Sequence, residues 1–76
     1  MAEQSWPEDA LGSVLRELRE QRGLTQIDLA ARAKIHRNYV GQLERGEKSP
    51  TVHSLGRLLR ALGVSWAEFG AALDAR

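Results

Sequence analysis

Cysteine is absent from this 76-residue chain. Without thiols, neither disulfides nor thiolate metal sites can reinforce the fold. A chain below about 80 residues seldom obtains more than about 3–5 kcal/mol of stability from a single core. We therefore expect the fold to depend on tight helix packing and on association with a second copy.

Long apolar runs are missing as well. No run approaches the roughly 18 residues of a membrane-spanning helix, and no charged-then-apolar leader opens the chain. We expect a cytoplasmic protein without a membrane partner. The chain is too short to divide into two useful cores, so we expect one domain over residues 1–76.

Patterns typical of enzymes and metal sites are also lacking. The two histidines, His36 and His53, do not have the four-residue spacing of a zinc protease. The Ser and Asp residues near them form no recognisable nucleophile motif. We expect no metal, no cofactor and no catalytic activity.

The net charge is only +1, but the charges are unevenly distributed. Residues 1–31 carry three arginines against six acidic residues, whereas residues 32–48 carry five cationic residues against two acidic ones. Partners respond to local fields rather than to totals. The basic stretch is therefore either a binding surface for an anionic partner or a solvated face on which charges cluster by chance.

Helical periodicity is present along the chain, and strand alternation is absent. A first helix is expected from a Ser5 cap, with Pro7 in its first turn, to about Gly23. Thr25 should cap a second helix, and Gly46 should end a third. The apolar positions expected to face the core of these helices are Leu11, Leu15, Leu18, Leu29, Ala30, Ala33, Tyr39, Val40 and Leu43.

Two more helices are expected after Pro50. Thr51 opens a fourth helix that ends at Gly63, and Ser65 with Glu68 forms a capping box for a fifth. Their expected apolar stripes are Val52, Leu55, Leu58, Leu59 and Leu62, followed by Trp66, Phe69 and Leu73. All connections are short, so the predicted fold is all-α, a compact five-helix bundle.

The second and third helices, within residues 25–45, are joined by about three residues, which is typical of a helix-turn-helix. The third helix should present its N-terminal turn outward, with Arg37, Asn38 and Gln42 exposed. Arg can fork to guanine, and Asn or Gln can pair with adenine, in the major groove of DNA. The spacing therefore predicts a DNA-reading face.

Residues 11–66 resemble the phage-repressor-like (Cro-type, XRE) helix-turn-helix family of bacterial and phage transcription regulators. The motifs that support the resemblance are "LRELREQRGLTQ", "LA", "HRNYVGQLERGEKSPT" and "LLRALGVS". The short length and "HRNYVGQLERGEKSP" are most similar to the controllers of restriction-modification systems. The resemblance implies a lambda-repressor-like DNA-binding domain.

The family also implies roles for matching positions. The base readers would be Arg37, Asn38 and Gln42, with residues 36–44 in the major groove. The residues that would contact the DNA backbone or brace the recognition helix are Gln26, His36, Tyr39, Arg45 and Lys48. Arg19 and Glu44 match an ion pair that joins the first helix to the third.

The sequence departs from the family at two positions. Lys34 stands where the family usually has a glycine with positive φ, and His36 stands where it often has a Ser or Thr cap. Two helical glycines are ambiguous: Gly41 would allow close approach to DNA, and Gly56 close helix packing, but either could be a tolerated surface residue.

The implied partners are an operator in double-stranded DNA and a second copy of the chain, with RNA polymerase as a further candidate. Two copies would bind an inverted repeat. The expected dimer interface is Val64, Trp66, Phe69, Ala72 and Leu73; alternatively, Trp66 and Phe69 fill the core of one copy. The competing function is a protein-interaction module on the same fold, such as an antitoxin or a coactivator-like adaptor.

Overall fold

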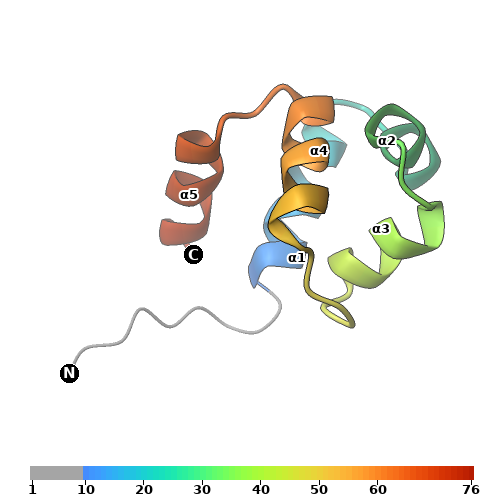
Figure 1. Ribbon diagram of the computed structural model, residues 1–76. Helices are drawn as coiled ribbons and strands as arrows, with labels where there is room; N and C mark the ends of the chain where they lie inside the picture. The colour runs from blue at the N-terminus through green and yellow to red at the C-terminus, as the bar shows by residue number, and fades with distance from the viewer. Residues whose placement is uncertain (1–9) are drawn as a thin grey trace.

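Five helices and no strand make up residues 10–76, the part of the chain that the computed structural model describes (Figure 1). The helices are α1 (Ala10–Gln21), α2 (Gln26–Ala33), α3 (Arg37–Glu44), α4 (Val52–Leu62) and α5 (Trp66–Asp74). The predicted all-α fold is thus confirmed. The expected cap at Ser5 and the first turn at Pro7 lie outside the described residues.

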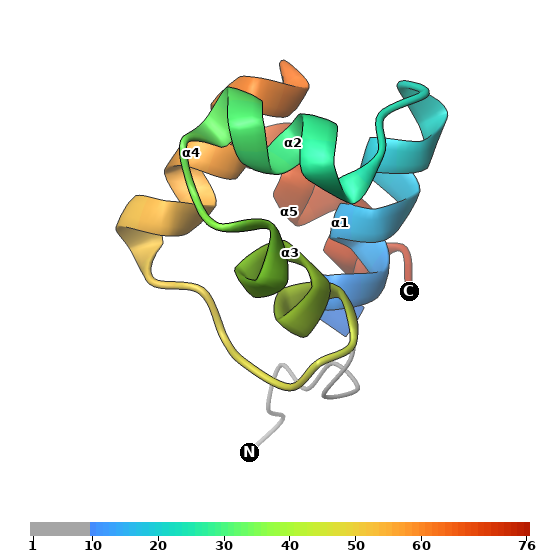
Figure 2. The same cartoon turned by 90° about the vertical axis from the view of Figure 1, so that its right-hand side faces the viewer.

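The two helices of the helix-turn-helix lie on one side of the molecule and α5 lies on the other, with α1 and α4 between them (Figure 1). α2 packs against α3 and α4, while α3 also packs against α1. Figure 2 faces the helix-turn-helix side and shows α3 in front, with α2 above it. This arrangement leaves one side of α3 open to solvent.

Local capping defines the short helices. The Thr25 hydroxyl accepts from the backbone N–H of Asp28, and the Thr25 N–H donates to Asp28 Oδ2, both at 3.0 Å. Thr51 and Ser65 begin α4 and α5 with the same reciprocal capping. These predicted helix starts are confirmed, and α4 ends at Gly63 with a left-handed φ of 71°.

The core receives side chains from all five helices. The largest side chains that are fully buried are Val14, Leu15, Leu29, Val40, Leu43 and Leu58. The expectation that Val52 faces the core is wrong, because its side chain is 79% exposed. Val52 is the first residue of α4 and lies at the edge of the apolar stripe, so no neighbouring helix covers it.

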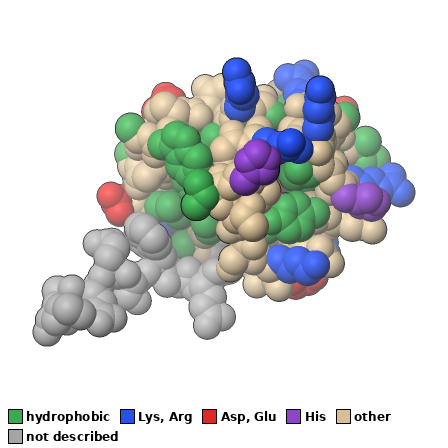
Figure 3. Space-filling view, in the orientation of Figure 1, with side chains coloured by type: hydrophobic (Ala, Val, Ile, Leu, Met, Phe, Trp, Pro, Cys, Tyr) green, Lys and Arg blue, Asp and Glu red, His purple; other side chains and the backbone are tan. Residues whose placement is uncertain are grey.

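The uneven charge distribution of the sequence is also visible on the surface. Arg32 and Lys34, near the end of α2, line a shallow hollow with Arg57 and Arg60 of α4. Figure 3 shows the Lys and Arg side chains of the drawn face mainly over its upper and right-hand parts. None of the helices in residues 10–76 is long and apolar enough to cross a membrane.

Candidate nucleic-acid interface

Helix α3 has two chemically different faces. Val40, Leu43 and Glu44 are buried against the rest of the molecule. Arg37 and Asn38 are exposed on the opposite face, and Gln42 is half-buried one turn further along. The inward face fixes the position of the helix, so the outward face can present its polar groups in a defined orientation.

The outward face of α3 and the start of α2 enclose an open hollow, which we call the α2–α3 hollow. Its lining residues are Gln26, Ile27, Arg37, Asn38, Gly41, Gln42 and Arg45. The structure therefore brings the three expected base readers together with Gln26 and Arg45. The expected contact residues His36, Tyr39 and Lys48 do not line this hollow.

Sequence reasoning missed Ile27, which is 55% exposed in the α2–α3 hollow. The helical periodicity could have revealed it, because Ile27 lies off the helix face formed by Leu29, Ala30 and Ala33. A large apolar side chain on the wrong face of a short helix indicates a surface role.

His36 and Tyr39 connect α3 to its surroundings. His36 is the N-cap of α3, and its Nδ1 accepts a 3.1 Å hydrogen bond from the backbone N–H of Asn38. An accepting Nδ1 carries no proton, so in the neutral ring Nε2 is the donor. The Tyr39 hydroxyl lies 3.0 Å from Ser54 Oγ, which joins α3 to α4.

Lys34 occupies the turn between α2 and α3 with φ 60° and ψ 45°, as expected from the family pattern. A left-handed conformation costs a side chain about 1–2 kcal/mol. Hydrogen bonds offset this strain: the N–H of Ile35 donates to Ala30 O at 3.0 Å, and Arg57 Nη1 donates to Lys34 O at 3.3 Å. The turn keeps its geometry without a glycine.

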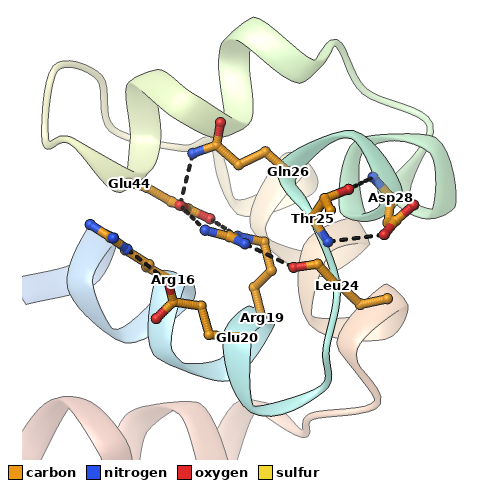
Figure 4. Close-up of polar contacts among 8 residues, drawn as sticks. All are labelled: Arg16, Arg19, Glu20, Leu24, Thr25, Gln26, Asp28 and Glu44. Atoms are coloured by element: carbon orange, nitrogen blue, oxygen red, sulfur yellow. Dashed lines mark hydrogen bonds and ion pairs between the residues drawn. The ribbon is translucent and has the colours of Figure 1, made fainter.

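The ion pair predicted between Arg19 and Glu44 is present and lies beneath α3 (Figure 4). Arg19 Nε and Nη2 donate to the two carboxylate oxygens at 2.7 and 2.9 Å, and Nη1 donates to Leu24 O at 2.8 Å. The side chains are only 10% and 3% exposed. The hydrogen bonds to Glu44 raise the pKa of the Arg19 guanidinium, so this buried group keeps its positive charge.

Gln26 extends this network to α2. Its Nε2 donates to Glu44 Oε1 at 3.0 Å, so the same carboxylate joins the first residue of α2 to α1 and α3. This contact performs the bracing that the family resemblance implied for Gln26. At the α2 N-terminus, hydrogen bonds from Thr25 lower the pKa of Asp28, which keeps the cap in its charged, accepting form near neutral pH.

Two glycines permit close packing around α3. A Cβ on Gly12 would lie 2.2 Å from Leu43 O and 2.8 Å from Glu44 O, so α1 crosses α3 in backbone contact. Sequence reasoning missed this role, since nothing local distinguishes Gly12. A Cβ on Gly41 would lie 2.9 Å from Arg45 Nη1 and 3.4 Å from Gln26 Oε1, so Gly41 makes room for side chains of the α2–α3 hollow.

The five residues expected at a dimer interface separate into two groups. Val64, Phe69 and Leu73 are buried in the core of this chain, and Ala72 is partly buried against it. Leu73, which was also expected in the apolar stripe of the fifth helix, is covered because α5 packs on α1 and α4. Trp66, 52% exposed, is the large apolar side chain of this set that remains accessible.

Residues 15–69 match the helix-turn-helix family model HTH_3. The chain belongs to this family, in its XRE (Cro) type. The HTH-type transcriptional regulator y4dJ of Sinorhizobium fredii, itself uncharacterized, is 45% identical over 58 residues, which are 76% of this chain and 75% of y4dJ. The chain is 37% identical to the regulator SutR of Escherichia coli over 59 residues, but these are only 33% of SutR.

Solved structures agree with this assignment. The restriction-modification controller protein C.Esp1396I, in a tetramer bound to its natural 35 base-pair operator, matches with a TM-score of 0.86 and 29% identity over 95% of each chain. The expected resemblance to such controllers is therefore confirmed. By family, this chain is a helix-turn-helix transcriptional regulator.

Proposed function

We propose that this regulator binds an operator in double-stranded DNA, with α3 in the major groove. The observation that supports the proposal is the division of α3 into a buried face and a polar, accessible one. Arg37 can donate two hydrogen bonds to guanine, while the Asn38 and Gln42 carboxamides match adenine. The Arg19–Glu44–Gln26 network holds this reading face from behind.

Contacts to phosphate would surround the base readers. His36 can donate from Nε2 because Nδ1 is used in the cap, and Lys48 lies exposed in the loop after α3. Arg45 Nε lies 2.6 Å from Glu47 Oε2, and the hydrogen bond from Arg45 lowers the pKa of Glu47. Because its charge is partly compensated, we expect Arg45 to contribute less to phosphate binding than Lys48.

Exchanging Arg37 for alanine should relax the choice of base at one operator position. The loss of a bidentate contact should cost about 1–3 kcal/mol with the preferred base and much less with the others. To measure this, a binding sequence is first enriched by the protein from a random pool of duplexes. Variants of that sequence, with each of the four base pairs at every position, are then titrated with the wild type and with Arg37→Ala.

Lys48→Ala is the matched control for this experiment. It should weaken all duplexes alike and reduce the slope of log affinity against log salt by about one. If Arg37→Ala discriminates among bases as sharply as the wild type, Arg37 is not a base reader.

We further propose that two copies act together on an inverted repeat. One recognition helix reads too few base pairs to separate an operator from competing genomic sites. A two-fold axis would place two recognition helices about 34 Å apart, one turn of the duplex. The tetrameric assembly of C.Esp1396I on its operator supports self-association.

The accessible apolar side chains favour an interface along the edge between α4 and α5. Trp66 and Val52 border a groove there with His53, Gly56 and Arg57. In Figure 1 this edge lies on the other side of α4 from α2 and α3, so a second copy could bind without covering the reading face. Aromatic side chains are frequent anchors at such interfaces.

Trp66→Glu should therefore shift the chain from dimer to monomer, because the interface would have to bury a charge. Light scattering over a range of protein concentrations would show a mass near 8.5 kDa for the variant and near twice that value for the wild type. Ala31→Glu, on the exposed side of α2, is the control and should remain dimeric. A wild type that stays monomeric even with operator DNA contradicts the dimer.

A protein-interaction module is the second candidate function, and the exposure of Trp66 and Val52 favours it. Such a module would tolerate the loss of Arg37 and Asn38 and would enrich no sequence from a random pool. If the regulator does bind an operator, it acts in the cytoplasm, and RNA polymerase at the neighbouring promoter is a further expected partner.

A further inference from the structure

Three large apolar side chains are well exposed in residues 10–76, and one of them lies apart from the others. Val52 and Trp66 border the groove between α4 and α5, whereas Ile27 lies in the α2–α3 hollow. Its neighbours there, Arg37 and Asn38, are polar groups of the reading face. Ile27 does not serve the core, because α2 buries Leu29, Ala30 and Ala33 instead.

We propose that Ile27 is a specificity-determining residue that contacts the C5-methyl group of a pyrimidine in the major groove. This inference rests on the proposed function. A base pair offers donors, acceptors and, in thymine, one apolar group, the 5-methyl. An isoleucine side chain makes no hydrogen bonds, so this methyl is the base-edge group that it can recognise. The same methyl is present in 5-methylcytosine.

The surroundings of Ile27 hold it in a defined position. Thr25 and Asp28 fix the backbone on both sides through their reciprocal hydrogen bonds of 3.0 Å. Gln26, directly before Ile27, is tied to the buried Glu44. A β-branched side chain in a helix has one strongly preferred rotamer. Ile27 therefore presents its apolar surface beside Arg37 and Asn38 at little cost in conformational entropy.

The test begins with random duplex pools, one unmodified and one in which all cytosines are 5-methylated. Each pool is enriched for binding to the wild-type protein. The enriched duplexes are then synthesised with uracil replacing one thymine at a time, or with cytosine replacing one 5-methylcytosine. Dissociation constants are measured for the wild type, for Ile27→Ala and for the control Gln21→Ala.

We expect the wild type to lose about fourfold in affinity when a single methyl group is removed at the position that Ile27 contacts in either half-site. Ile27→Ala should bind the duplexes with and without that methyl equally well. Gln21→Ala also shortens an exposed side chain, but Gln21 lies at the end of α1, outside both the α2–α3 hollow and the α4–α5 groove, so this variant should keep the wild-type response. An effect of uracil identifies thymine as the source of the methyl, and an effect of cytosine identifies 5-methylcytosine.

Two results would overturn the inference alone: an enriched sequence that tolerates every methyl removal, or a methyl effect that persists in Ile27→Ala. Enrichment of no sequence from either pool would overturn the proposed function together with it. Thermal unfolding of Ile27→Ala should match that of the wild type, because the side chain is exposed.

Discussion

Glu44→Ala is expected to lower the free energy of unfolding by about 3–5 kcal/mol, the typical cost of removing one partner from a buried ion pair. The change leaves the Arg19 guanidinium buried, with only its hydrogen bond to Leu24 O. It also removes the acceptor for Gln26 Nε2. One core in a chain of this length supplies about the same free energy, so the variant should be largely unfolded at 25 °C.

The double variant Arg19→Met with Glu44→Leu separates the cost of a lone charge from the value of the pair. Because both charges are replaced by apolar groups, we expect much of the lost stability to return. Urea unfolding measures the free energy of unfolding of the single and the double variant. It is monitored by circular dichroism at low temperature, where the single variant retains structure.

Arg16→Ala is the control for this cycle. It removes the pair between Arg16 and Glu20, whose side chains are 63% and 52% exposed, and such pairs contribute about 0–1 kcal/mol. If Glu44→Ala were as mild as Arg16→Ala, the buried network would not stabilise the recognition helix.

Gly12→Ala should destabilise the fold by about 3 kcal/mol, near the upper end of the usual cost of overpacking. Alanine is the better helix former by about 1 kcal/mol. Its Cβ, however, would lie 2.2 Å from Leu43 O and 2.8 Å from Glu44 O. These are backbone atoms at the end of α3, so the clash is relieved only when α1 moves away from the recognition helix.

Gly56→Ala makes the same substitution in another helix. A Cβ there would meet only Trp66 Cζ2, at 3.4 Å. We expect unchanged or slightly higher stability, because the gain in helix propensity meets no backbone obstacle. The urea midpoint should therefore fall for Gly12→Ala and stay unchanged or rise for Gly56→Ala. Equal shifts would show that the packing of α1 on α3 does not require a glycine at position 12.

The sequence by itself determined where most of the helices begin and end. Thr25, Thr51 and Ser65 cap α2, α4 and α5 as predicted, and Gly63 ends α4. These assignments succeed because a cap depends on atoms within three or four residues along the chain. The split of α3 into buried and exposed residues likewise follows from its periodicity.

The Arg19–Glu44 pair was predicted through the family resemblance, since the two residues are 25 positions apart and no local pattern relates them. The same distance in sequence explains what was missed. Position 12 requires a glycine because the backbone oxygens at the end of α3 leave no room for a Cβ. Only the packing of α1 against α3 reveals this.

Only the tertiary structure decided which apolar residues remain exposed. Leu73 is buried and Trp66 is half exposed although both lie on α5, because α1 and α4 cover one part of that helix and not the other. Ile27 lines the α2–α3 hollow because the start of α2 lies beside α3. Amphipathic periodicity shows which face of a helix is apolar, but burial depends on the neighbouring helices that distant parts of the chain supply.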